Sequence, residues 1–361
     1  MDKVQFVYRD SKLPSDQSHV DRVNDAANRL AAKLRNVDFQ SLNISDYSKR
    51  YNKDNFRKFR FIIQANAFNL LWTIDTLQRD PQNISLLDYG AGTGWLTFLA
   101  KEAGIGKVYY SDIFAPACED ARLVADALNI KLDGYFAGDS KVIREHFQKG
   151  LKLDALLSRN VIEHIYDLNE FFQDCSSLKP RPLCMMATTA NLANPMVAAY
   201  TKRLQRKAEF QDQKTKWGSK PRDDNRAYLT IREELISKKF PKLRAGEIRT
   251  LAKRTRGLIE PDIYQAVTKY LQTNELPKSP AGNTNTCDPF TGNWTERLIP
   301  LKTYEEIAGR SGYQVDVING FYNTDYSQTW LNMITPWINR TIKKTGNSGR
   351  FLAPFIILRF R

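Results

Sequence analysis

The chain has 361 residues, of which 42% are apolar, and a formal net charge of +14 at pH 7. This length predicts one large domain with an inserted or accessory part, and the apolar content excludes a disordered chain. No apolar run approaches the ~18–20 residues of a membrane-spanning helix, and the first residues lack the apolar stretch of a signal peptide. The four cysteines are widely spaced, which argues against zinc ribbons and disulfide scaffolds. We therefore expect a soluble, cytoplasmic protein with reduced thiols.

Helices are expected at the start of the chain, over residues 1–80. Residues 15–35 place apolar side chains three to four positions apart, as in an amphipathic helix, and Ser15 or Asp16 can cap it. Residues 50–79 form another helical run, which Asp80 and Pro81 end.

Short apolar runs then alternate with helical stretches. The first five runs are 84–90, 107–113, 132–138, 153–159 and 183–189. This alternation is typical of βαβ units, and near-continuous apolarity suits parallel strands that are covered on both faces. About 95 mostly helical residues follow before two more runs, 313–322 and 350–360. The pattern predicts an α/β domain over 81–195 and 291–361, interrupted by a helical insertion over 196–290.

Basic residues concentrate in the insertion. Residues 196–270 carry 19 lysines and arginines against 9 acidic residues, a surplus of ten within the net charge of +14. One interpretation is a solvated helical face. The other is a basic lid that attracts an anionic substrate, such as a phosphate, a carboxylate, an acidic glycan or nucleic acid. Charge alone does not distinguish them.

The first strand runs into a glycine-rich turn. Asp88 is followed by Gly90, Gly92 and Gly94 in the spacing G-x-G-x-G, and a helix begins at Trp95. The glycines permit a sharp turn and close approach of a ligand, at a helix N-terminus whose amides favour an anionic group. The dinucleotide fingerprint G-x-G-x-x-G needs a glycine where Trp95 stands, and a P-loop needs a following Gly-Lys-Ser/Thr. Both are excluded.

An acidic residue, one spacer and G-x-G-x-G resemble the first motif of the class I S-adenosylmethionine (SAM)-dependent methyltransferases. Asp112 at the end of the second strand, Gly138-Asp139 after the third and the stretch 153–168 also resemble motifs of this family. The resemblance covers residues 84–190 and the two final strands. It implies SAM as the cofactor and a Rossmann-like, seven-stranded α/β sheet in the order 3-2-1-4-5-7-6, with the last strand antiparallel.

The resemblance also implies roles for individual residues. Asp112 would accept hydrogen bonds from both ribose hydroxyls, Asp139 would lie beside the adenine amine, and Ile113 would form an apolar wall. Trp95 would either cover the cofactor or pack its helix against the sheet. The expected cofactor-binding residues are Asp88, Gly90, Ala91, Gly92, Gly94, Trp95, Asp112, Ile113, Gly138, Asp139, Ser140 and Asn160.

His164 and Glu163 are the catalytic candidates. Of the three histidines, His19 and His146 lie in charged helical stretches, where we expect solvated or structural roles. His164 follows the fourth strand, close to where the methyl group should be, and is the candidate general base. The alternative is that it bonds to a backbone group and only positions the loop. Glu163 would pair with a local cation or reach the cofactor loop.

The spacing of Asn160, Glu163 and His164 is similar to the E-x-x-E-H metal motif of small-RNA 2′-O-methyltransferases and ubiquinone-type O-methyltransferases. Here Asn160 replaces the first carboxylate, and no histidine or cysteine cluster supplies a further ligand. We therefore expect no catalytic metal.

Acceptor-pocket candidates lie in and after the insertion. The arginine forks near residue 226 suit carboxylate or phosphate, although a surface stripe would give the same pattern. In similar enzymes, the loop before the sixth strand helps to close the pocket. The candidates are Arg226, Tyr228, Trp294 and Glu296, with Arg222 and Arg232 beside the first two.

Three functions remain open. The first is methyl transfer from SAM to a small or medium organic acceptor, such as a glycan-type molecule, at an oxygen of an anionic or sugar-like substrate. The second is a nucleic-acid (RNA) methyltransferase that uses the insertion as a backbone clamp. The chain shows no RNA-binding module, and Asn194-Pro195-Met196 does not complete the D/N-P-P-Y/F/W signature of amino-group methylation. The third is a non-catalytic SAM-binding protein. No membrane partner is expected.

Overall fold

The computed structural model describes residues 4–212, 225–278, 280 and 284–361. Contacts divide the chain into two compact units. The sheet unit consists of Met1–Ile162, Asp167–Asn194 and Pro300–Arg361, and the helical unit of Glu163–Tyr166 and Pro195–Ile299. The N-terminal helices therefore belong to the same unit as the sheet.

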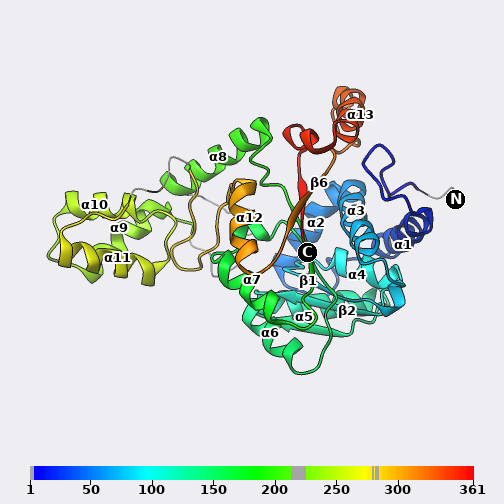
Figure 1. Cartoon of the computed structure of the whole chain (residues 1–361), viewed down its shortest axis with the longest axis horizontal. Coiled ribbons are helices and arrows are strands. Elements are labelled where there is room, and N and C mark those ends of the chain that lie inside the picture. The colour runs from blue at the N-terminus through cyan, green and yellow to red at the C-terminus, as the bar shows by residue number, and fades with distance from the viewer. Residues whose placement is uncertain (1–3, 213–224, 279, 281–283) are drawn as a thin grey trace. The chain divides into compact units, whose positions relative to one another are not determined.

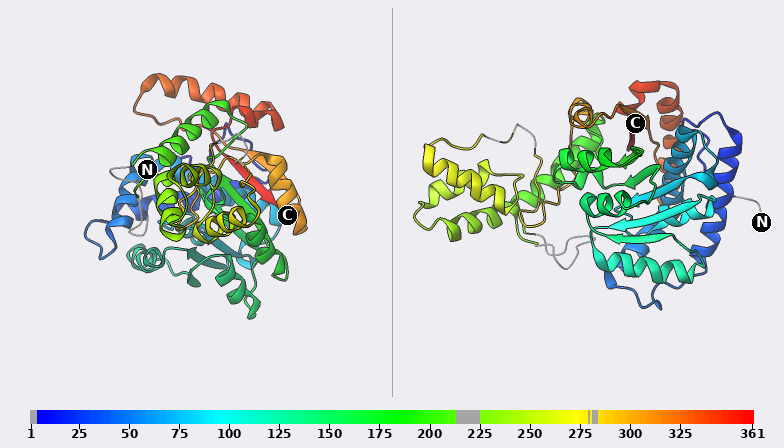
Figure 2. Two further views of the ribbon diagram at one scale, coloured as in Figure 1. Left: turned by 90° about the vertical axis from the view of Figure 1, so that its left-hand side faces the viewer. Right: turned by 60° about the horizontal axis from the view of Figure 1, so that its bottom comes forward.

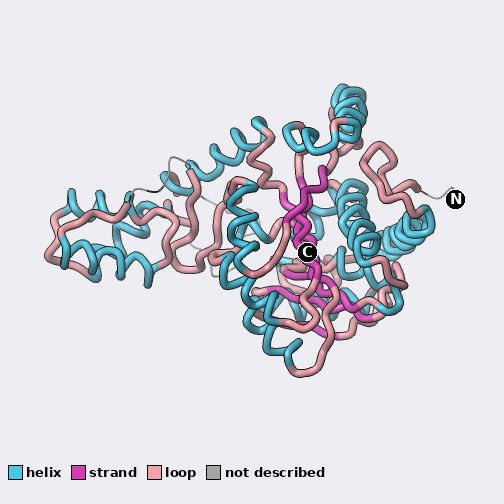
Figure 3. The backbone as a smooth tube through the Cα atoms, viewed as in Figure 1, coloured by secondary structure: helices cyan, strands magenta, loops and turns pink. Residues whose placement is uncertain are grey.

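The sheet has seven strands in the order β3-β2-β1-β4-β5-β7-β6. Strands β1 to β5 pair in parallel, and β7 runs antiparallel between β5 and β6. The predicted order and the antiparallel last strand are confirmed. Figure 3 shows the strands of the sheet in magenta. The strands are β1 Ser85–Tyr89, β2 Lys107–Asp112, β3 Gly134–Ala137, β4 Ala155–Arg159, β5 Leu183–Thr188, β6 Val315–Asn319 and β7 Ile356–Phe360.

Helices α1, α3 and α4 pack on one another, and α3 also contacts β4 and β5 (Figures 1 and 2). Helix α1 begins after Asp16, whose carboxylate accepts a hydrogen bond from the Ser18 amide at 2.8 Å, which confirms the predicted cap. The helices of the sheet unit are α1 Gln17–Arg35, α2 Asp46–Arg57, α3 Phe59–Leu77, α4 Trp95–Glu102, α5 Ala115–Ala127, α6 Ser140–Gln148, α7 Leu168–Ser177, α12 Leu301–Arg310 and α13 Thr329–Lys344. Three short 3₁₀ turns are η1 Pro81–Asn83, η2 Ile162–His164, which crosses from one unit to the other, and η3 Gly346–Phe351.

The main core lies between these N-terminal helices and one face of the sheet. Strand residues at alternate positions, including Leu86, Val108 and Leu157, are completely buried in it. Helix α3 is apolar on most of its surface because it is covered both by α1 and by the sheet. This packing fixes the carboxyl ends of β1 and β2, where the glycine-rich turn and Asp112 lie.

The helical unit has a hydrophobic core of its own, built from α9 and its neighbours. Its helices are α8 Pro195–Phe210, α9 Tyr228–Lys239, α10 Ala245–Arg254 and α11 Glu260–Thr273. Arg232 is fully buried, forms an ion pair with Glu209 and donates to the Ala252 carbonyl at 2.8 Å. A buried arginine that is both paired and hydrogen-bonded holds α8, α9 and α10 together. No described helix in either unit is long and apolar enough to cross a bilayer.

Candidate cofactor and catalytic sites

The glycine-rich turn has the backbone geometry that only glycine adopts readily. Gly90, Gly92 and Gly94 have φ of +68°, +54° and +75°, and Gly94 is the N-cap of α4. A Cβ built on Gly90 would lie 2.6 Å from Cγ2 of Val161, and one on Gly92 would lie 3.0 Å from Cε1 of Tyr51. Val161 and Tyr51 therefore pack closely against the turn, and the turn leads directly into the N-terminus of α4.

Asp112 is fixed beside this turn by two backbone amides. Its Oδ2 accepts a hydrogen bond from the Gly92 amide at 3.1 Å and its Oδ1 accepts one from the Phe114 amide at 2.8 Å. Tyr110 reinforces the same corner by donating its hydroxyl to the Gly92 carbonyl at 2.6 Å. A carboxylate oxygen can accept more than one hydrogen bond, so this geometry suits a ligand that offers hydroxyl donors. The residues present therefore fit the ribose of SAM.

Asp88 is 2% exposed, and its Oδ2 accepts a hydrogen bond from Oγ1 of Thr97 in α4 at 2.7 Å. Burial raises the pKa of its carboxyl from 3.8 to about 7, and the Thr97 hydrogen bond opposes this shift. Asp88 thus ties β1 to α4 on either side of the glycine-rich turn.

The raised pKa of Asp88 predicts a pH-dependent stability. The folded state prefers the protonated carboxyl, so its stabilising contribution is complete below about pH 4 and is lost as the pH rises to about 7. The side chain that replaces this carboxyl in Asp88→Asn is neutral at every pH. We therefore expect the free energy of unfolding of this variant, relative to that of the native chain, to increase by about 1–3 kcal/mol between pH 4 and pH 7. Urea denaturation across this range measures the difference, and a difference that does not change with pH would contradict the prediction.

The remaining cofactor candidates of the sheet unit lie at strand ends. Asp139 is exposed and caps α6 by accepting from the Lys141 amide at 3.0 Å, and Ser140 donates its hydroxyl to Asp174 at 2.6 Å. Ile113 is 53% exposed. Asn160, at φ +58°, accepts from the Thr189 amide at 3.3 Å. The roles of these side chains toward SAM stay predictions, as does that of Gly138.

Sequence reasoning missed the contribution of α2 to the glycine-rich turn. Asn52 Oδ1 accepts a hydrogen bond from the Trp95 indole at 2.9 Å, and Asn55 Nδ2 donates to Thr93 Oγ1 at 3.0 Å. Both asparagines are buried in the structure, but in the sequence they stand in an otherwise charged helix, which gives no signal of these contacts. Helix α2 therefore holds the turn from outside the sheet.

Trp95 is 2% exposed and lies edge-on to the rings of Phe56 and Phe59 at centroid distances of 5.2 and 5.6 Å. Of its two expected roles, the structure shows packing. Through these rings it packs α4 against α2 and α3.

In the helical unit, His164 lies next to two residues from the loop before α12. Nδ1 of His164 lies 2.7 Å from the Trp294 carbonyl oxygen, and Nε2 lies 3.7 Å from Oε1 of Glu296. A carbonyl oxygen only accepts, so this contact requires the proton on Nδ1. In the neutral ring, Nε2 then keeps its lone pair for a proton or a metal.

Glu163 completes the cluster. Its side chain is fully buried, and its backbone carbonyl accepts from the Arg297 amide at 3.1 Å. One ligand atom from each of Glu163, His164 and Glu296 lies within 4.8 Å of the others. Asn160 stands where the metal motif has its first carboxylate, three positions before Glu163. Glu296, which is distant in the sequence, supplies a second carboxylate beside Glu163 and His164. The donor set could accept a divalent cation, and the absence of a catalytic metal stays a prediction.

The acceptor candidates occupy different places in the helical unit. Trp294 and Glu296 lie beside His164, as described. Arg226 forms an ion pair with Glu234, and Tyr228 is 5% exposed in the core of the unit. Arg222 lies outside the described residues. A role of Arg226 or Tyr228 in an acceptor pocket remains a prediction.

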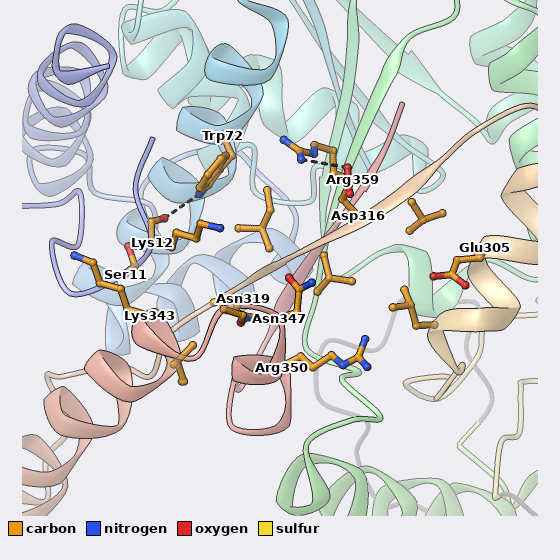
Figure 4. Close-up of a pocket in the computed structure, with 17 residues that line it drawn as sticks. Ser11, Lys12, Trp72, Glu305, Asp316, Asn319, Lys343, Asn347, Arg350 and Arg359 are labelled. Atoms are coloured by element: carbon orange, nitrogen blue, oxygen red, sulfur yellow. Dashed lines mark hydrogen bonds and ion pairs between the residues drawn. The ribbon is translucent and has the colours of Figure 1, made fainter. Parts of the chain in front are cut away.

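A separate cavity of about 450 Å³ follows the edge strand β6 in the sheet unit (Figure 4). Its lining mixes charges: Arg359 pairs with Asp316 at 3.1 Å, and Lys12, Lys343 and Arg350 contribute cations. It contains no residue of the glycine-rich turn and lacks Asp112. We therefore do not assign it to the cofactor.

A family model described as a methyltransferase domain matches residues 54–233, about half of the chain and the part that carries the turn and Asp112. The chain belongs to the class I SAM-dependent methyltransferases. Its cofactor is SAM, and the assignment of the glycine-rich turn and Asp112 to this cofactor stays a prediction.

Two curated proteins are similar to parts of this chain. A ubiquinone biosynthesis O-methyltransferase of Chelativorans sp. (strain BNC1) is 30% identical over 142 residues, which cover 36% of this chain and 54% of the relative. A ribosomal protein L11 methyltransferase of Methylobacillus flagellatus is 39% identical over 70 residues, which cover 19% of this chain and 23% of the relative. The chain thus spans about half of the first relative and a quarter of the second.

Two solved structures match most of the chain at low similarity. An S-adenosylmethionine-dependent methyltransferase from Mesorhizobium loti is 12% identical, with a TM-score of 0.36, over 81% of this chain and 97% of that one. The cyclopropane synthase MmaA2 from Mycobacterium tuberculosis is 13% identical, with a TM-score of 0.34, over 81% of each chain.

Proposed function

We propose that the chain transfers the methyl group of SAM to an oxygen of a small or medium anionic or sugar-like acceptor, with His164 as the general base. The observation that carries the proposal is the contact of 2.7 Å between Nδ1 of His164 and the Trp294 carbonyl. It sets the tautomer in which Nε2 can receive the proton of an acceptor hydroxyl.

The proposal gives each group of residues a separate role. The glycine-rich turn and Asp112 bind and orient SAM, which when bound supplies a methyl group activated by a positive sulfonium. His164 lies five residues beyond Arg159, the last residue of β4, along the chain. Its Nε2 removes the hydroxyl proton as the acceptor oxygen becomes the nucleophile, and the Glu296 carboxylate at 3.7 Å stabilises the resulting imidazolium.

Two observations support oxygen as the methylated atom and a negative charge on the acceptor. The curated relative that matches the larger share of this chain is named an O-methyltransferase. The insertion carries a surplus of ten positive charges between residues 196 and 270. We therefore propose residues 196–290 as a lid that selects the acceptor, with electrostatic attraction that salt weakens.

The same surplus supports the alternative, an RNA methyltransferase that uses the insertion as a clamp on the phosphate backbone. The two acceptors can be separated by one assay. The purified chain is incubated with SAM labelled at its methyl group and with cell extract divided into RNA and small-molecule fractions.

We expect label in alkali-stable products of the anionic small-molecule fraction, and an acceptor KM that rises with salt while the SAM affinity stays constant. Label in the RNA fraction alone would contradict the proposal and support an RNA methyltransferase instead. Label that is lost with hydroxylamine or mild alkali would show a carboxyl ester rather than an ether.

A further inference from the structure

Helix α13 exposes a stripe of large apolar side chains. Trp330, Met333, Ile334 and Trp337 are 61%, 70%, 46% and 70% exposed. Their spacing of i, i+3, i+4 and i+7 places them on one side of the helix. Single exposed apolar residues are common on protein surfaces. Four neighbouring ones on one side of a helix form a patch, and such a patch indicates an interaction surface. We call these four residues the α13 stripe.

The opposite side of α13 attaches it to the sheet unit. Thr335, Asn339 and Ile342 are buried, and Asn339 accepts from the Tyr322 amide at 2.7 Å and donates to the hydroxyl of Tyr8 at 3.0 Å. Helix α13 is therefore packed through the side opposite the stripe. Figure 1 shows α13 at the outside of this unit.

The charged side chains around the stripe are mostly basic. Residues 326–361 contain six lysines and arginines and no aspartate or glutamate. Arg340 and Lys344 continue the side of the stripe toward the C-terminal end of the helix, and both are exposed. Lys343 donates to the carbonyl of Arg9, which brings another exposed cation to this end. The acid among these contacts is Asp10, which pairs with Arg340 at 3.3 Å.

We propose that α13 binds the surface of an anionic lipid bilayer, lying in the plane of the interface with its stripe among the acyl chains. Tryptophan favours the boundary between headgroups and acyl chains, and a cationic helix end complements anionic headgroups. This goes beyond the proposed methyl transfer and does not depend on it.

Charge complementarity favours a lipid surface over a second copy of the chain. Helix α13 has no acidic residue that a symmetry-related copy could offer to Arg340 and Lys344. The expectation that no membrane partner exists followed from the lack of a spanning segment, which says nothing about a helix that lies in the interface.

The test is co-sedimentation of the full chain with vesicles of phosphatidylcholine alone or with 30% phosphatidylglycerol. We expect binding to the anionic vesicles, at least tenfold weaker binding to neutral ones, and loss with 0.5 M salt. The double variant Trp330→Ser/Trp337→Ser should reduce the partition coefficient at least tenfold, because it removes two indole rings that are 61% and 70% exposed in the folded chain. Lys344→Glu should reduce it severalfold.

Matched controls come from exposed residues elsewhere. Leu271→Ser changes an apolar side chain that is 53% exposed on α11, and Lys302→Glu reverses the charge of a lysine side chain that is 84% exposed on α12. Both should bind within twofold of the native chain. No binding to anionic vesicles, or equal binding by the double tryptophan variant, would overturn the proposal. A native dimer that this variant converts to a monomer in sedimentation velocity would assign the stripe to a second copy instead.

Discussion

Replacing His164 by alanine is expected to lower kcat by about 10²–10⁴ and to leave the affinity for SAM unchanged. The imidazole contacts Trp294 and Glu296 in the helical unit, whereas the residues that fit SAM lie in the sheet unit. Loss of the base should also remove the acidic limb of the pH profile of kcat. Single-turnover methylation together with calorimetric titration of SAM measures both quantities.

Two controls separate a base from other roles of His164. His146→Ala changes an exposed histidine of α6 and should leave kcat unchanged. Activity of the native chain should persist in EDTA. A decrease of only a few-fold in His164→Ala would show that the histidine positions its loop. A rate that EDTA abolishes and Mg²⁺ restores would show that Glu163, His164 and Glu296 hold a metal instead.

Replacing Gly92 by valine is expected to reduce the affinity for SAM more than 100-fold while the chain still folds. The Cβ would lie 3.0 Å from the Tyr51 ring, and Gly92 also donates its amide to Asp112 and accepts from Tyr110. A branched side chain there displaces both the turn and the carboxylate that fits the ribose. Isothermal titration calorimetry with SAM measures the loss.

Gly346 offers a closely matched control. It has the same φ of +54°, but a Cβ there would meet nothing within 4 Å. Gly346→Val therefore carries a similar backbone strain of about 1–2 kcal/mol without the contact at the turn. It should be destabilised to a similar degree and should bind SAM normally. Equal losses of SAM affinity in the two variants would contradict the assignment of the turn to the cofactor.

The sheet could be predicted from the sequence because its information is local. Each strand is a short apolar run, helical runs separate the first five, and parallel strands that are buried on both faces need no alternation to be recognised. The order of the strands came from the resemblance that began at Asp88 and the three glycines. Helix α13 was missed because it lies between two strands that the family pattern treats as neighbours.

The glycine-rich turn was also predictable from local information. Gly90, Gly92 and Gly94 have positive φ angles, which glycine adopts readily, and their spacing is visible in the sequence. The support from α2 was not predictable, because Asn52 and Asn55 meet Trp95 and Thr93 only after the chain has folded back. Two buried asparagines in a charged helix look like ordinary surface residues until their partners are known.

The cluster around His164 illustrates the limit most clearly. Glu296 follows His164 by 132 positions, and the tautomer of the ring depends on the carbonyl of Trp294, which has no sequence signature. Spacing alone identified Asn160, Glu163 and His164 as a group, whereas the fold joins Glu163 and His164 to Glu296. Contacts of this range depend on how the loop before α12 packs within the helical unit.

The most direct test of the account is calorimetric titration of the full chain with SAM, S-adenosylhomocysteine, NAD and ATP, repeated with Asp112→Ala. The two sulfur nucleosides are expected to bind and NAD and ATP are not, because the turn lacks the third glycine of the dinucleotide fingerprint and the lysine of a P-loop. Asp112→Ala should weaken SAM binding by about 1.5–3 kcal/mol, the range for hydrogen bonds to a charged group. Binding of NAD without binding of SAM, or an Asp112→Ala variant that binds SAM as tightly as the native chain, would contradict the assignment of this site.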